Sequence, residues 1–307
     1  MHEHVARSMY YFSVHLLYAS LVGCAAWLLT SLRGASATTK YWIWVISAVN
    51  FIVPAGAALD KLLASHLSWA HPLGVIGGPV WDMTEGRRAV LLAAIWFAGA
   101  FVMSIRLIWR VRTEVRDQVP AGLSYRTASS LAAGVPVSFG SRHSGPAVRG
   151  ILSPCIVFPS GIKRVLDERE FDAVLIHELA HAKRRDNLIR LLYEISLCAL
   201  WFHPLVWLAG ARMALYRELS CDECVVRRAQ GRALLSALAK LAAPEAALFL
   251  QATASSHVGD RLAGLVGSST TNRRATNLIL ISLFAAIVGA GIFQTIAHTA
   301  CCFILRH

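Results

Sequence analysis

The sequence predicts a mainly α-helical membrane protein that carries a smaller α+β domain on one side of the bilayer. Three observations support this fold class. Of the 307 residues, 56% are hydrophobic and only 16% are charged, whereas soluble domains average about 25% charged residues. Four segments stay apolar over the roughly 20 residues that a membrane-spanning helix needs. Between the third and the fourth segment, short β-like pieces are followed by strongly helical sequence.

The four predicted transmembrane helices lie towards the two ends of the chain. They run approximately over Met9–Leu32, Tyr41–Leu62, Ala89–Trp109 and Thr276–Ala297. The first could be taken for a signal peptide, because Ala35-Ser36-Ala37 resembles a cleavage site. Its apolar core is longer than the roughly 7–15 residues of a signal peptide, so we expect a retained helix.

The charge distribution predicts the orientation of the chain. The formal net charge is +12, and in so apolar a chain this excess is typical of loops at an anionic cytoplasmic face rather than of nucleic-acid binding. Arginines follow the third helix and precede the fourth, at Arg106, Arg110, Arg112, Arg116, Arg273 and Arg274. We therefore expect an outside N-terminus and a cytoplasmic middle region. This divides the chain into a transmembrane region (1–110), a cytoplasmic domain (111–275) and a fourth helix with a short tail (276–307), with no folded extracellular domain.

The strongest chemical motif is His177-Glu178-Leu179-Ala180-His181, an H-E-x-x-H sequence inside an apolar helical run. Positions i and i+4 share a helix face, so His177 and His181 can offer imidazole nitrogens to one metal ion. Glu178 then lies beside the metal, where its carboxylate can take a proton from bound water. The alternative is three polar residues on a solvated face, which the apolar flanks disfavour. The motif predicts a zinc hydrolase site with Glu178 as the base.

A zinc ion held by two histidines needs a third protein ligand and leaves a fourth position for water. The apolar run from Leu188 to Leu215, as one straight helix, would carry the following residues about 40 Å away from His181. The proline of His203-Pro204 interrupts such a helix. We therefore predict a membrane-associated helical hairpin that bends at Phe202–Pro204 and returns to the motif.

The returning helix supplies two carboxylates on one face. Glu218 is the predicted third zinc ligand, and Asp222 is predicted to accept the outer N–H of a ligating histidine. The alternative makes both of them surface partners of nearby arginines, namely Arg212, Arg217 or Arg228. Cys221 and Cys224 form a CxxC pair that could also bind zinc, but without a second pair we interpret them as packing residues.

Segments on either side of the motif complete the predicted domain. Strands are expected at Val135–Phe139, Ala147–Leu152 and Cys155–Phe158, where they either hold an extended peptide by strand addition or only support the helices. Asp167 is a predicted N-cap for the motif helix. The run Lys183-Arg184-Arg185-Asp186 could bind an acidic segment, but we interpret it as a set of cations that anchor the helix to anionic lipid.

Taken together, these motifs resemble the BlaR/MecR-type membrane metallopeptidases. The resemblance is carried by His177–Leu188, Trp201–Trp207, Arg217–Asp222 and the upstream Gly150–Pro159. It implies a zincin-like (gluzincin) endopeptidase in the bacterial inner membrane, with zinc on His177, His181 and Glu218 and with Glu178 as base. In relatives with antibiotic-sensing domains, activation leads to self-cleavage and to loss of a cytosolic BlaI/MecI-type repressor. We expect no penicillin-binding-like sensor in this chain.

The sequence is also compatible with two other functions. One is a membrane quality-control protease similar to HtpX, and the other is a non-catalytic signalling scaffold that keeps zinc for structure in a four-ligand site, for instance with Cys221. The expected partners are a peptide or protein substrate, a BlaI/MecI-type repressor, the lipid bilayer and a second copy of the chain. The exposed pair Arg273-Arg274 is a candidate self-cleavage site.

Overall fold

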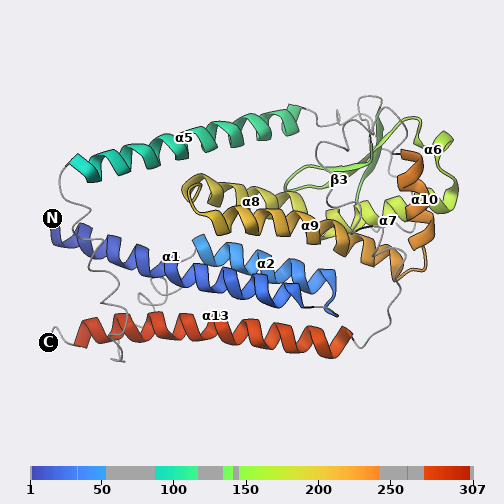
Figure 1. Ribbon diagram of the computed structural model, residues 1–307. Coiled ribbons are helices and arrows are strands. Elements are labelled where there is room, and N and C mark those ends of the chain that lie inside the picture. The colour runs from blue at the N-terminus through green and yellow to red at the C-terminus, as the bar shows by residue number, and fades with distance from the viewer. Residues whose placement is uncertain are drawn as a thin grey trace.

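The computed structural model describes residues 2–32, 34–52, 87–116, 134–140, 145–241, 261 and 273–304. Helices dominate, and they run side by side along the length of the molecule, while a mixed region lies at one end (Figure 1). The lengthwise helices are α1 (His2–Ser31), α2 (Ala37–Ile52), α5 (Arg87–Arg116), α8 (Asp186–Ala199), α9 (Pro204–Val226) and α13 (Arg273–Ile304). The mixed region holds the sheet with α6 (Ile162–Val165), α7 (Glu168–Arg184) and α10 (Gly231–Leu241).

The lengthwise helices correspond to the predicted apolar segments only in part. Helices α1, α5 and α13 cover the first, third and fourth predicted spans, and α2 covers the start of the second, whose residues 53–62 lie outside the described part of the chain. Among the described residues, Val90–Glu114 is the one helix that is long and apolar enough to cross a membrane, while His15–Ser31 and Arg274–Gly289 are shorter apolar helices. A mainly helical fold is therefore shown.

The bend of the predicted helical hairpin is confirmed, while the association of the hairpin with a membrane stays a prediction. Helix α8 ends at Ala199 and α9 begins at Pro204, where the missing proline N–H removes no helical hydrogen bond. The two helices approach closely at Gly210, because a Cβ atom there would collide with the ring of Tyr193. Tyr193 also donates its hydroxyl hydrogen to the carbonyl of Val206 at 3.0 Å. The hairpin lies between α5 and α2 (Figure 1) and packs against both helices.

The sheet has three strands in the order β1-β3-β2 among the described residues. Strand β1 (Val137–Gly140) is parallel to β3 (Cys155–Pro159), and β2 (Ala147–Arg149) is antiparallel to it. All three strands were predicted, with ends that differ by at most a few residues. The central strand is buried at Ile156, Val157 and Phe158, and two of these side chains join α7 and α10 in one apolar core. This core fixes the position of the motif helix.

Candidate metal centre

Helix α7 carries the H-E-x-x-H motif and is well defined at both ends. The Asp167 side chain accepts a hydrogen bond from the backbone N–H of Glu170 at 2.8 Å, and the Glu170 carboxylate accepts one from the N–H of Asp167 at 2.9 Å. This capping box confirms the predicted N-cap. At the other end Arg185 adopts the left-handed region, with φ 56°, and turns the chain directly into α8.

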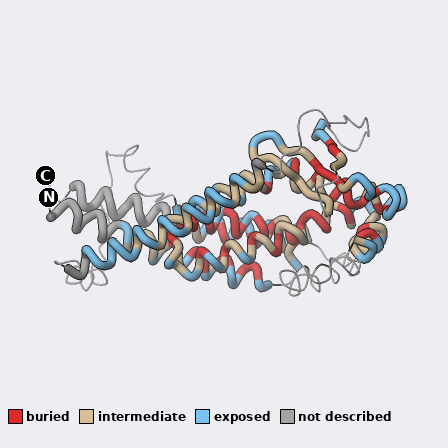
Figure 2. Tube along the Cα trace, turned by 90° about the horizontal axis from the view of Figure 1, so that it is seen from above, coloured by how far each residue is buried: buried red, intermediate tan, exposed pale blue. Residues whose placement is uncertain are grey.

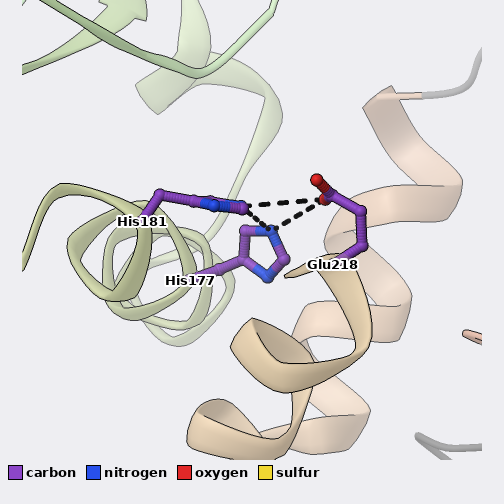
Figure 3. Close-up of side chains that lie close together, drawn as sticks. All are labelled: His177, His181 and Glu218. Carbon is purple, nitrogen blue, oxygen red and sulfur yellow. Dashed lines mark hydrogen bonds and ion pairs between the residues drawn. The ribbon is translucent and has the colours of Figure 1, made fainter. Parts of the chain in front are cut away.

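Two histidines of α7 and one glutamate of α9 converge on a single point (Figure 3). The Nε2 atoms of His177 and His181 lie 3.1 Å apart, and Oε2 of Glu218 lies 3.6 Å and 3.7 Å from them. The other carboxylate oxygen of Glu218 pairs with Arg217 at 3.0 Å, which leaves Oε2 facing the rings. Two nitrogens and one oxygen from adjacent helices form a donor set that fits a catalytic zinc ion.

The outer nitrogen of His177 faces a buried carboxylate. Oδ1 of Asp222 lies 3.0 Å from Nδ1 of His177. Asp222 also forms a bidentate pair with Arg261, whose Nε and Nη2 donate to the two carboxylate oxygens at 2.8 Å and 2.9 Å. The side chain of Asp222 is only 5% exposed, so the surface-partner alternative does not describe this residue. The sequence gives no local signal for this role of Arg261, which lies 39 positions after Asp222.

A second buried carboxylate holds His181, and sequence reasoning missed its role. Nδ1 of His181 donates to Oδ2 of Asp186 at 2.7 Å. Arg184 donates to both oxygens of Asp186 at 2.6 Å. The interpretation of this basic run as lipid-anchoring cations is therefore wrong for Arg184, because its guanidinium pairs with the buried carboxylate of Asp186. The sequence signal for this role is the position of Asp186, an acid that lies five residues after His181 and next to the end of the motif helix.

The electrostatics of the cluster follow from its carboxylates. Burial by itself would lower the pKa of His177, but Asp222 and Glu218 outweigh burial and raise this pKa to about 9. Burial would likewise raise the pKa of Glu218, but the two histidines bring it well below its usual value. The carboxylates of Asp222, Glu218 and Asp186 therefore favour positive charge on the two rings, although each also pairs with an arginine.

Glu178 and Cys221 complete the surroundings. Glu178 is half-buried and follows His177 on α7, close enough for its charge to act on that ring. Cys221 is fully buried on α9, and its Sγ accepts a hydrogen bond from Arg184 at 3.2 Å. His181, Asp186 and Cys221 form a second group of possible ligands. In this group Asp186 is already engaged by Arg184, so the set of His177, His181 and Glu218 fits a metal ion better.

The fold and the site define a class of protein: a helical protein in which a capped H-E-x-x-H helix and a returning hairpin helix assemble a centre suited to a divalent metal. Residues 11–265 match the family model described as BlaR1 peptidase M56. The chain belongs to this BlaR1 peptidase M56 family, as the motifs predicted. Membership supports a protease and implies a metal cofactor.

Curated relatives match a limited stretch of the chain. The regulatory protein BlaR1 of Bacillus licheniformis is 35% identical over 82 residues, which are 27% of this chain and 14% of the relative. The methicillin resistance mecR1 proteins of Staphylococcus aureus (strain Mu50) and Staphylococcus epidermidis are 27% identical over 93 residues, which are 30% of this chain and 16% of each relative. The aligned stretch thus spans a minor part of each relative.

Proposed function

We propose that the chain is a membrane-integrated zinc endopeptidase, with His177, His181 and Glu218 as metal ligands and Glu178 as catalytic base. The observation that carries the proposal is the convergence of two ring nitrogens and one carboxylate oxygen within 3.7 Å. Membership in a peptidase family supports it. Zinc is the metal that such a set of two histidines and one carboxylate commonly holds in hydrolases.

Each residue has a defined task in peptide hydrolysis. When bound, zinc acts as a Lewis acid that acidifies a water molecule and polarises the scissile carbonyl. Glu178 accepts the proton of the attacking water and passes it to the leaving amine. Asp222 and Asp186 fix the rings of His177 and His181 through their outer nitrogens.

The sheet is suited to present the substrate beside this centre. Asn187, in the first turn of α8, donates to the carbonyls of Val148 and Gly150 at 3.1 Å each. This contact holds β2 next to the end of the motif helix. We propose that an edge of the sheet binds the substrate backbone as an added strand.

The proposed topology has four transmembrane helices, an outside N-terminus and a cytoplasmic peptidase domain in the inner membrane of a bacterium. Its boundaries are 1–110, 111–275 and 276–307. The apolar helix Val90–Glu114 supports it, as do the arginines near and after the C-terminal end of that helix, at Arg106, Arg110, Arg112 and Arg116. By analogy with the regulatory protein BlaR1 and the methicillin resistance mecR1 proteins, we propose that the substrate is the chain itself or a BlaI/MecI-type repressor.

The test is a comparison of wild type with Glu178→Gln, using full-length protein purified in detergent. We expect equal zinc content and a loss of peptide cleavage of about 10²- to 10⁴-fold, the usual contribution of a general acid–base. Glu168→Gln, at an exposed glutamate of the same helix, serves as the matched control and should cleave normally. Cleavage by Glu178→Gln at the wild-type rate would refute the assignment.

A non-catalytic zinc scaffold is the second candidate, because Cys221 lies within reach of His181. If the protein is such a scaffold, the wild type should bind zinc but cleave no peptide.

The remaining alternative is a quality-control protease. A proteome comparison of cells that carry the wild type or Glu178→Gln distinguishes it from a dedicated regulator. Accumulation of one repressor indicates a dedicated regulator, whereas accumulation of many unrelated membrane proteins indicates quality control.

A further inference from the structure

The first turns of α2 lie directly against the metal centre. The hydroxyl of Tyr41 donates to Oδ1 of Asp186 at 3.1 Å, while Oδ2 of the same carboxylate accepts from His181 at 2.7 Å. Tyr41 is only 1% exposed and Asp186 only 4%. A continuous chain of hydrogen bonds therefore runs from an apolar helix of the bundle to one of the proposed ligands.

Arg184 contacts both Asp186 and Tyr41 in this chain of hydrogen bonds. It donates to both oxygens of Asp186, and its guanidinium carbon lies 4.3 Å from the centre of the Tyr41 ring. This distance is within the range of a favourable cation–π contact. Asp186 is thus fixed from two sides, by a cation that is stacked on Tyr41 and by the hydroxyl of Tyr41 itself.

Helix α2 is fixed to the catalytic helices at a second point. The carboxylate of Glu223, on α9, accepts from the backbone N–H of Ala37 at 2.9 Å and from the N–H of Thr38 at 3.5 Å. An acidic side chain at a helix N-terminus is favourable, because it satisfies free N–H groups and complements the helix dipole. Glu223 directly follows Asp222, which faces His177. The start of α2 is therefore bound next to the partners of both histidines.

We propose that Tyr41 is a positioning residue of the metal centre, through which α2 holds Asp186 and thereby sets the orientation of the His181 ring. A change in the position of α2 would then change the orientation of the His181 ring without any contact between α2 and the substrate. This inference rests on the proposed zinc centre and adds to it an element of the helical bundle on which the centre depends.

The test is Tyr41→Phe in the full-length protein in detergent, which removes only the hydroxyl and keeps the ring under Arg184. Zinc affinity is measured by competition with a chelator, and ligand geometry by the visible spectrum after loading with Co²⁺. Direct partners of metal-bound histidines are worth about 10- to 100-fold in metal affinity, so one step further out we expect a loss of about three- to tenfold. The cobalt spectrum should change as well.

Tyr18→Phe is the matched control, since its hydroxyl donates to the carbonyl of Val288 at 2.8 Å, between α1 and α13. It should leave zinc affinity and the cobalt spectrum unchanged. A double-mutant cycle then tests the route: Tyr41→Phe should add nothing to Asp186→Asn, because residues that act through one another are not additive. Helix content by circular dichroism verifies that each variant is folded.

The outcomes separate the two proposals. If folded Tyr41→Phe binds zinc as Tyr18→Phe does and gives the same cobalt spectrum, Tyr41 has no positioning role while the metal centre stands. Additive effects of the two substitutions would also overturn the proposed route through Asp186. A wild type that binds no zinc would overturn both the centre and the role of Tyr41.

Discussion

Helices α2 and α5 are both apolar in sequence, yet they occupy different environments. In α2 one face is buried, with Trp44 at 0% exposure, Tyr41 at 1% and Ile43 at 2%, while Trp42 and Ile46 are exposed. In α5 comparable side chains are open, with Trp109 at 69% exposure and Phe101 at 67%. Figure 2 shows the same contrast, with exposed residues following one long helix and buried residues concentrated in the interior and the mixed region.

The contrast follows from what each helix packs against. Helix α2 contacts α1, α8, α9 and α13, whereas α5 packs mainly on α8. A run of apolar residues shows that a helix leaves water, but it does not show whether protein or lipid takes the place of water. We infer that one face of α2 is part of the core around the candidate metal centre, whereas no residue of α5 is buried over 90–114.

The largest expected difference is in the response to truncation. Trp44→Ala removes a fully buried side chain whose Nε1 donates to Thr30 at 3.1 Å, and it should lower the free energy of unfolding by about 3–5 kcal/mol. Phe101→Ala, on the open face of α5, should change it by no more than about 0.5 kcal/mol. Denaturant unfolding in mixed micelles measures both. Equal losses would contradict the contrast between the two helices.

A smaller effect is expected where α5 meets the hairpin. A Cβ atom at Gly99 would collide with the indole of Trp201, which donates its Nε1 hydrogen to the carbonyl of Trp96 at 3.2 Å. Gly99→Ala should therefore cost about 1–3 kcal/mol through overpacking. Gly289→Ala in α13 is the control, since no described atom lies within 4 Å of the new Cβ. Thermal unfolding of the two variants measures the cost, and equal midpoints would refute this account of the α5–hairpin contact.

The smallest effect concerns acid sensitivity at the contact between α7 and α10 in the mixed region. Hydrogen bonds from Lys240 and Ser236 lower the pKa of Glu170 from its ordinary value of 4.5 to about 2. Because the folded-state pKa is the lower one, this carboxylate stabilises the fold above about pH 4.5, and the contribution is lost as the pH falls towards 2.

Glu170→Gln should therefore flatten the acid limb of the stability profile between about pH 5 and pH 2. Urea unfolding across this range measures it, with Glu168→Gln, at an exposed glutamate of the same helix, as control. An acid limb that is unchanged in Glu170→Gln would show that this carboxylate does not carry the effect.

Much of the site could be predicted because its signals are local. The four-residue spacing of His177 and His181 places them on one face, Asp167 marks the start of their helix, and Pro204 marks the bend that returns Glu218. Each of these inferences needs only the helix period, one capping side chain or the missing N–H of one proline. The structure brings the predicted ligands together for that reason.

The missed residues depend on contacts between distant segments. Tyr41 reaches Asp186 across 145 positions of sequence, and Arg261 reaches Asp222 across 39. The sequence pattern of Arg184 favours the lipid surface, because cations beside an apolar helix have the same pattern whether they face lipid or a buried acid. The contacts of Arg184 with Tyr41, Asp186 and Cys221 show that it faces the protein interior.

X-ray absorption of the zinc-loaded protein tests the central claim most directly, because it reports the ligand atoms. If His177, His181 and Glu218 hold the ion, the first shell contains only nitrogen and oxygen, at about 2.0–2.2 Å. A sulfur at about 2.3 Å would instead place zinc on His181, Asp186 and Cys221 and would contradict the catalytic centre described above.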